Sequence, residues 1–230
     1  MYKKLHDSSR GCGLPVFWVS DSVYKKDCAV FGGQWQEISN FPNAKLERGV
    51  RRTAFLTCCF YGFEDLVKNV CDLKRCTHYR THKGQSGLQI AARHGFQALV
   101  SLLVDSGMID KYDAGTTALH QACEAGYIGV VKTLLDADFP PDETQNYSYV
   151  NTGDINRRTP LHLAAGNDQS AVIELLLQQP NIDVNACDQF KYSALRAAWK
   201  YSKRSLRLLL EDSRVDREIV DIYGKKYDEA

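Results

Sequence analysis

The sequence predicts an all-α solenoid of five to six helix-turn-helix repeats joined by β-turn fingers. Three observations lead to this prediction. A seven-residue segment recurs along the chain, a glycine follows three of its copies at a fixed distance, and an apolar run at helical spacing follows four of them. The copies recur roughly every 33 residues, and self-similarity at a period of about 20–50 residues is typical of solenoid proteins.

The clearest copy of the recurring segment is Thr159–Ala165, with the sequence TPLHLAA. The other copies begin at Thr53, Ser86, Thr117 and Ser193, so the leading residues are separated by 33, 31, 42 and 34 positions. The longest interval indicates an insertion of about nine residues relative to a usual repeat length of about 33. The sequence therefore predicts five stacked repeats, each opened by one of these residues.

Each leading Thr or Ser is predicted to begin the inner helix of its repeat. A hydroxyl at this position accepts a hydrogen bond from an early backbone N–H, and Pro160 loses no hydrogen bond at the first helical position. The small pairs Ala91-Ala92 and Ala164-Ala165 allow such short helices to pack closely against their neighbours.

A turn and an outer helix are expected to follow each inner helix. Gly62, Gly95 and Gly126 lie nine positions after their leading residues, where the chain must turn and where glycine takes a positive φ at little cost. Asp168 and Ser202 stand at this place in repeats four and five, so those turns are expected to be less regular. The outer helices are predicted from their apolar runs, whose stripes should face inward. These runs are Leu99–Leu103, Val130–Leu135, Val172–Leu177 and Leu206–Leu210.

With these motifs, the chain resembles the ankyrin-repeat family over residues 46–230. The resemblance implies an L-shaped stack whose fingers and inner helices form a concave groove that binds other proteins. A partial repeat opens at Asp221, so either the chain belongs to something longer or a short stub closes the stack. Residues 1–45 are interpreted as a degenerate capping repeat or as an irregular or β-hairpin extension, because their glycines and aromatic residues suit either.

Composition and charge are those of an ordinary globular protein. The net charge of +1 gives no general signal for binding nucleic acid or a membrane surface. No N-terminal apolar segment or membrane-spanning run is present, which predicts a cytoplasmic, possibly nuclear, protein. A nucleic-acid binder would need a contiguous basic stripe, and the mixed charges argue against one.

Catalytic and metal-binding motifs are weak or lacking. The sequence has no P-loop, Rossmann fingerprint or nucleophile elbow, so we expect no enzyme activity and no cofactor. His120 and His162 are the motif histidines, which in similar proteins bond locally. Cys58, Cys59 and Cys123 are interpreted as core thiols. The ligand types of zinc also occur at Cys71, Cys76, His78 and His82, but their spacing is poor and no metal is expected.

The resemblance places partner contacts on the fingers and on the exposed ends of the inner helices. These positions are basic and aromatic, as protein interfaces favour, so the expected partner is another protein or an acidic or aromatic-flanked peptide. Arg157, Arg158, Phe190 and Tyr192 are expected near the centre. Solvated finger residues are the alternative, and Trp199 could equally fill space in a divergent last repeat. The predicted contacts are Tyr61, His82, Lys83, Arg93, Lys111, Tyr112, Arg157, Arg158, Phe190, Tyr192, Trp199 and Tyr201.

Two further features are particular to this chain. The insertion at 138–153 contains Pro140-Pro141, and its residues 146–150 could extend a finger into a longer hairpin; it is either functional or a neutral surface loop. The segment from Leu177 to Ala186 is similar to the sequence that the oxygen-sensing asparaginyl hydroxylase modifies in ankyrin repeats, with Asn185 as its target. An adaptor, scaffold or regulator, a substrate-recruiting subunit of an enzyme complex, and a pathogen effector all fit this sequence.

Overall fold

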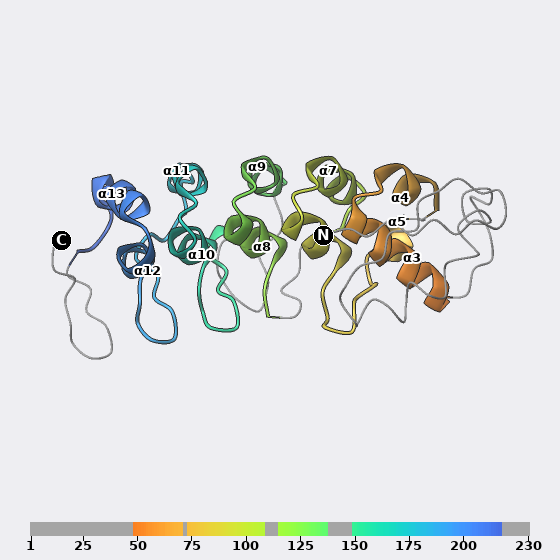
Figure 1. Cartoon of the computed structure of the whole chain (residues 1–230), viewed down its shortest axis with the longest axis horizontal. Coiled ribbons are helices and arrows are strands. Elements are labelled where there is room, and N and C mark those ends of the chain that lie inside the picture. The colour runs from red at the N-terminus through yellow and green to blue at the C-terminus, as the bar shows by residue number, and fades with distance from the viewer. Residues whose placement is uncertain (1–47, 71–72, 109–114, 138–148, 218–230) are drawn as a thin grey trace, which may run out of the picture.

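The computed structural model describes residues 48–70, 73–108, 115–137 and 149–217, and shows a solenoid of two helical layers (Figure 1). Inner helices form one layer and outer helices the other, and the fingers extend from the inner layer away from the outer one. The inner helices are α3 (Arg48–Tyr61), α6 (Gly87–Arg93), α8 (Ala118–Ala125), α10 (Pro160–Gly166) and α12 (Ala194–Tyr201). The outer helices are α4 (Glu64–Val70), α7 (Gln97–Asp105), α9 (Ile128–Asp136), α11 (Ser170–Leu177) and α13 (Lys203–Glu211), and a short helix, α5 (Leu73–Cys76), follows α4.

Local capping explains where the inner helices of repeats two to four begin. The hydroxyls of Ser86 and Thr117 accept hydrogen bonds from the N–H groups of Gln89 and His120, at 3.1 and 3.4 Å. In return, the side chain of the third helical residue accepts the N–H of the capping residue, at 3.0 Å for Gln89, 3.3 Å for His120 and 3.1 Å for His162. This reciprocal arrangement is a capping box, and it confirms the predicted helix starts at these three positions.

The same three side chains join each repeat to the next finger. Gln89 Nε2 donates to the carbonyl of Thr116 at 2.8 Å, and the Nε2 atoms of His120 and His162 lie 3.0 and 2.9 Å from the carbonyls of Arg158 and Tyr192. Each of these bonds spans about one repeat, so a residue that caps its own helix also fixes the position of its neighbour.

The turns between inner and outer helices follow the sequence prediction except in repeat four. Gly62, Gly95 and Gly126 have φ angles of 74°, 77° and 81°, in the left-handed region that glycine adopts easily. Asp168 also adopts a positive φ, of 58°, whereas Ser202 is extended with φ −150°. The turn at Asp168 therefore has the same geometry as the glycine turns, so the expected irregularity is wrong for repeat four and is confirmed only for repeat five.

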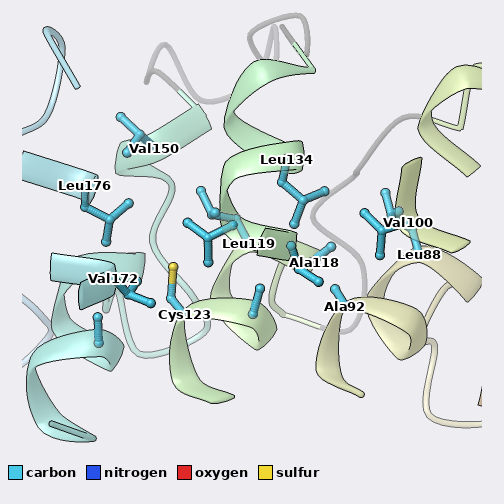
Figure 2. Close-up of a cluster of buried hydrophobic side chains, with 14 of the residues drawn as sticks. Leu88, Ala92, Val100, Ala118, Leu119, Cys123, Leu134, Val150, Val172 and Leu176 are labelled. Carbon is cyan, nitrogen blue, oxygen red and sulfur yellow. The ribbon is translucent and has the colours of Figure 1, made fainter. Parts of the chain in front are cut away.

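Stacking produces one continuous apolar core between the two layers (Figure 2). Leu119 of α8 and Leu134 of α9 both lie in this core and are fully buried. The small residues of the inner helices, including Ala91, Ala92 and Cys123, are also fully buried, which allows the helices to pack closely. Cys58, Cys59 and Cys123 are buried free thiols, which confirms the core-thiol interpretation for all three. Burial also raises the pKa of each of these thiols, that of Cys58 to about 12.

One of the five predicted helix starts, at Thr53, is wrong, and the start at Ser193 is confirmed but lacks the predicted hydroxyl cap. Thr53 lies inside α3, which begins at Arg48, because the preceding residues are compatible with helix and include the good helix formers Arg51 and Arg52. Ser193 precedes α12, but its buried hydroxyl has no hydrogen-bond partner. The third helical residue there is Arg196, which cannot accept the N–H of Ser193 as Gln or His does.

The end of the insertion is also different from the sequence prediction. Tyr149–Asn151 forms a 3-10 turn rather than part of an extended hairpin, and Val150 is buried in the core. Val150 precedes Thr159 by nine positions, as Val184 precedes Ser193, so Tyr149–Asn151 already belongs to the regular repeat. Residues 138–148 of the insertion, the 1–45 extension and the partial repeat from Asp221 lie outside the described residues.

Candidate functional site

The fingers of repeats four and five are held in shape by one buried aspartate each. Asp154 Oδ1 accepts hydrogen bonds from the N–H groups of Asn156 and Arg158, both at 2.8 Å. Asp188 Oδ1 accepts those of Phe190 and Tyr192, also at 2.8 Å. Both carboxylates are turned inward and less than a tenth exposed, so they rigidify the fingers without adding negative charge to the finger tips.

The two fingers are also hydrogen-bonded to each other. Gln189 N donates to the carbonyl of Asn156 at 3.0 Å, and Gln189 Nε2 donates to Asn156 Oδ1 at 3.1 Å. The bond from His162 to the carbonyl of Tyr192 fixes finger five against the inner helix α10. Neighbouring fingers therefore form one continuous surface.

Finger five and the inner helix α12 bring together aromatic rings and a guanidinium group. The rings of Phe190 and Tyr192 lie 6.0 Å apart between centroids. The guanidinium carbon of Arg196 lies 5.4 Å from the ring centroid of Tyr192 and 4.7 Å from that of Trp199, within the usual range of cation–π contacts. We call these four residues the C-terminal aromatic cluster. Phe190 and Trp199 are nevertheless 47% and 40% exposed.

The surroundings of the C-terminal aromatic cluster are strongly basic. Residues 189–210 contain six Lys or Arg residues and no Asp or Glu, although the whole chain has a net charge of only +1. Lys200 Nζ lies 4.8 Å from the ring centroid of Tyr201, which is 62% exposed. Four of the predicted contacts, Phe190, Tyr192, Trp199 and Tyr201, thus share one basic and aromatic region.

Arg157 and Arg158, predicted as a pair, have different environments. Arg158 Nη2 lies 2.7 Å from Asp154 Oδ2, and Arg158 Nε donates to the same oxygen at 2.9 Å. Arg158 therefore helps to hold the finger together, with a side chain that is still 43% exposed. Arg157 is exposed at the finger tip and has a φ of 62°, in the left-handed region.

The remaining predicted contacts lie toward the other end of the stack. Tyr61 stacks on Phe63 at 5.7 Å, and Arg93 is exposed at the end of α6. His82 and Lys83 are exposed in finger two, which turns at Gly84. Lys111 and Tyr112 are outside the described residues. The structure does not gather these residues with the C-terminal aromatic cluster, so the predicted contacts fall into two groups.

Asn185 lies between the outer helix α11 and finger five, where both polar atoms of its side chain are hydrogen-bonded. Its Nδ2 donates to the carbonyl of Arg214 at 2.8 Å, and its Oδ1 accepts the N–H of Asp216 at 2.7 Å. The predicted modification target therefore also has a structural role.

The possible zinc ligands fall in different environments. Cys76 is buried in the core, whereas His78 and His82 are exposed, and Cys71 lies outside the described residues. Within the described part of the chain, no group of three or more His, Cys, Asp or Glu side chains is placed to hold a metal ion.

Two residues of the site were not among the predicted contacts. Arg196 occupies the position that Gln89, His120 and His162 take in earlier repeats, and this departure from the pattern was a signal that could have revealed it. Ile155 is 76% exposed in finger four, where an apolar residue in a polar loop was a similar signal.

Comparison with known proteins identifies the repeats. The family model for ankyrin repeats (3 copies) matches residues 55–146, and the model for a single ankyrin repeat matches residues 156–189. Ankyrin repeats are modules for protein–protein interaction. None of the described helices combines the length and the apolar character needed to cross a lipid bilayer.

Three curated relatives match part of the chain. The chain is 29% identical to Rabankyrin-5 of Mus musculus over 49% of its length, and 24% identical to Alpha-latrotoxin-Lg1a of Latrodectus geometricus over 67%. It is 35% identical to Probable E3 ubiquitin-protein ligase XBOS32 of Oryza sativa subsp. japonica over 45%. These matches cover 9%, 11% and 20% of the respective relatives.

Proposed function

This chain belongs to the ankyrin-repeat family, and we propose that it acts as a non-catalytic adaptor, scaffold or regulator that binds another protein through fingers and inner helices. The proposed contact surface centres on repeats four and five and includes the C-terminal aromatic cluster, Arg157 and Tyr201. The proposed partner segment is acidic or contains aromatic residues, and the proposed compartment is the cytoplasm or nucleus.

The exposed C-terminal aromatic cluster is the observation that carries this proposal. Tyr, Trp and Arg are the side chains that most often dominate binding energy at protein interfaces. Here Arg196 lies within cation–π distance of Tyr192 and Trp199, which restricts all three before any partner arrives. Binding to a surface that is already ordered loses less side-chain entropy, so the same contacts give tighter binding.

The other group of predicted contacts would extend the surface in a longer partner. Tyr61, His82, Lys83 and Arg93 lie on repeats one and two, and Lys111 and Tyr112 belong to finger three. A partner that spans the stack would touch both groups, whereas a short peptide would need only repeats four and five.

A substrate-recruiting subunit of an enzyme complex is the second candidate function. The similarity to a protein named as a probable E3 ubiquitin-protein ligase favours it, because a binding module of this kind could select substrates there. An effector that acts on a host protein would use the same surface. The identity of the captured partner separates these roles, because capture of a ubiquitin-ligase component would favour a substrate-recruiting subunit.

Affinity capture with quantitative mass spectrometry tests the proposal. We compare the full chain with a Trp199→Ala, Tyr201→Ala variant and expect the specifically captured proteins to be strongly depleted. Tyr127→Ala is the matched control, because Tyr127 is also an aromatic residue that is 40% exposed but lies in repeat three. A purified partner must then bind the full chain in calorimetry. If the Trp199→Ala, Tyr201→Ala variant captures the same proteins as the full chain and the Tyr127→Ala control, repeats four and five are not the binding surface.

A further inference from the structure

Three residues other than glycine have a positive φ in the described part of the chain. They are Arg157, Asp168 and Lys191, with φ of 62°, 58° and 59°. The left-handed conformation is less favourable than the right-handed one for a residue with a side chain, because Cβ comes too close to the following carbonyl oxygen. Fingers two and three use Gly84 and Gly115 at the turn instead, so the fold itself does not require a side chain there.

The unfavourable conformation of Asp168 is offset within the molecule. Its Oδ1 accepts hydrogen bonds from the hydroxyls of Ser202 and Ser205, the latter at 3.3 Å. These bonds tie the turn between α10 and α11 to the start of α13. The side chain of Asp168 therefore has a structural role that glycine could not fill.

Arg157 and Lys191 have no such internal role. Both are exposed, and neither side chain forms a hydrogen bond or salt bridge with another described residue. They occupy the same position in successive fingers, each two residues before the leading Thr159 or Ser193. The tips of the two fingers are adjacent, because Gln189 N donates to the carbonyl of Asn156 at 3.0 Å and Gln189 Nε2 donates to Asn156 Oδ1 at 3.1 Å.

The surroundings of the two basic residues favour an anionic ligand. The carboxylates of Asp154 and Asp188 are buried and bonded to the backbone, so they do not compete as surface partners. Ile155 and Phe190 are exposed beside the basic residues and offer apolar contact. Arginine binds carboxylates with two parallel hydrogen bonds, and lysine acts as a point charge.

We propose that Arg157 and Lys191 form a two-residue contact for the carboxylates of an extended acidic protein segment that lies across the tips of fingers four and five. This inference rests on the proposed function, because the same segment would continue toward the C-terminal aromatic cluster. It adds the location of the acidic contact and explains why two fingers have a basic side chain where glycine would be less strained.

Glycine is the appropriate substitution for a test, because it removes the side chain and accepts the left-handed backbone. We use the full chain with Arg157→Gly, with Lys191→Gly and with both changes. The probe is a fluorescein-labelled peptide of alternating Glu and Tyr residues, and the same peptide with Gln in place of Glu is its neutral counterpart. Lys132→Ala is the control, because it removes one exposed positive charge from the outer helix α9.

We expect the Glu peptide to bind the full chain more tightly than the Gln peptide. Each glycine variant should weaken Glu-peptide binding about three- to fivefold and the double variant about tenfold or more, as for exposed charge pairs. Lys132→Ala should leave binding unchanged, and none of the glycine variants should lower the melting temperature.

Several outcomes would overturn the inference. If the glycine variants bind the Glu peptide as the full chain does, while Trp199→Ala weakens it, the finger-tip contact is wrong and the proposed function stands. If the full chain binds neither peptide, or binds both equally, acidic recognition is wrong. If single-stranded DNA of equal charge binds more tightly and depends on the same two residues, the contact serves nucleic acid and not protein.

Discussion

At the scale of single residues, His120 connects two repeats through its two ring nitrogens. Its Nδ1 lies 3.3 Å from the N–H of Thr117, and its Nε2 lies 3.0 Å from the carbonyl of Arg158. This arrangement fits the neutral ring with its proton on Nε2. The Thr117 hydroxyl, 2.8 Å from Nδ1, could accept a second proton there, but the bond from the Thr117 N–H would be lost and a charge would be placed in the core, so the charged form is disfavoured. Burial is the largest cause that lowers the pKa of His120 to about 4.

The stability of the stack should therefore decrease in mild acid. His120 in the unfolded chain has a pKa near 6.5, so the unfolded state takes up the proton first as the pH falls. The stabilisation is complete above pH 6.5 and is lost toward pH 4, by about 3 kcal/mol if each unit is worth about 1.4 kcal/mol. Burial also lowers the pKa of His162, which adds to the loss. Urea unfolding at pH 7.5 and pH 4.5 measures the difference.

The chain supplies its own control for this prediction. Gln89 makes the same two kinds of hydrogen bond in repeat two: its Oε1 accepts the N–H of Ser86, and its Nε2 donates to the carbonyl of Thr116. Unlike histidine, glutamine does not titrate. His120→Gln with His162→Gln should keep the bonds at pH 7.5 and lose most of the pH dependence between pH 6.5 and 4.5. An unchanged pH dependence would assign the acid sensitivity to other groups.

Capping could be predicted from the sequence, whereas the role of Arg196 could not. Ser86 and Thr117 bind atoms three residues away, so a short window of sequence contains the whole interaction. Arg196 contacts Tyr192 and Trp199 only when finger five and α12 are both in place. The site depends on contacts between elements, which a local motif does not contain.

At the scale of elements, two asparagines hold the connections between outer helices and fingers in the same way. Asn151 Nδ2 donates to the carbonyl of Asn181 at 2.6 Å, and its Oδ1 accepts the N–H of Asp183 at 2.8 Å. Asn185 makes the equivalent pair of bonds to Arg214 and Asp216 in the next repeat. The asparagine side chain of one connection thus forms hydrogen bonds with a backbone carbonyl and a backbone N–H of the next connection.

Removing the side-chain amide of either asparagine should lower the free energy of unfolding by a similar amount. We expect Asn151→Ala and Asn185→Ala each to lower the free energy of unfolding by about 1–2 kcal/mol, because each removes two hydrogen bonds that contribute about 0.5–1.5 kcal/mol apiece. Asn185→Asp keeps the acceptor and loses the donor, so its effect should be smaller than that of alanine at neutral pH. Urea unfolding measures all three variants, and a neutral Asn185→Ala would contradict the structural role.

Hydroxylation of Asn185 remains a proposal at this scale. Because both polar atoms of the side chain are engaged, an asparaginyl hydroxylase would act on the connection only when it opens. After treatment, intact-mass analysis should show the addition of one oxygen atom to the full chain and none to Asn185→Ala. An unchanged mass of the full chain under conditions that modify a control substrate would remove the proposal.

The insertion shows a limit of sequence periodicity for whole elements. The 42-residue interval revealed that residues had been added between repeats three and four, but it did not reveal where the regular pattern resumes. The pattern resumes at Val150, because this side chain must fill the core position that Val184 fills in the next repeat. Burial selects the register there, and one valine in a polar loop gave only a weak signal.

At the scale of the whole molecule, the main helix contacts in the described part of the chain run within a repeat or between neighbouring repeats. Inner helices α6, α8, α10 and α12 pack in series, as do outer helices α7, α9, α11 and α13. In such an array, stability is close to a sum of repeat and interface contributions, and the ends can open while the rest stays folded. The basic and aromatic surface lies on repeats four and five, and we expect these repeats to open while repeats two and three stay folded.

Two substitutions of fully buried leucines should show this independence. Leu119 lies in α8 in the middle of the stack, and Leu209 lies in α13. Each change to alanine should lower local stability by about 2–5 kcal/mol, the usual range for such a cavity in a core. Leu209→Ala should accelerate amide hydrogen exchange in α12 and α13 and leave α6 and α8 protected. Leu119→Ala should instead accelerate exchange on both sides of repeat three, because it weakens two interfaces. Equal acceleration throughout the chain in Leu209→Ala would mean that the stack unfolds as a single unit, and the binding surface would then share the stability of the whole molecule.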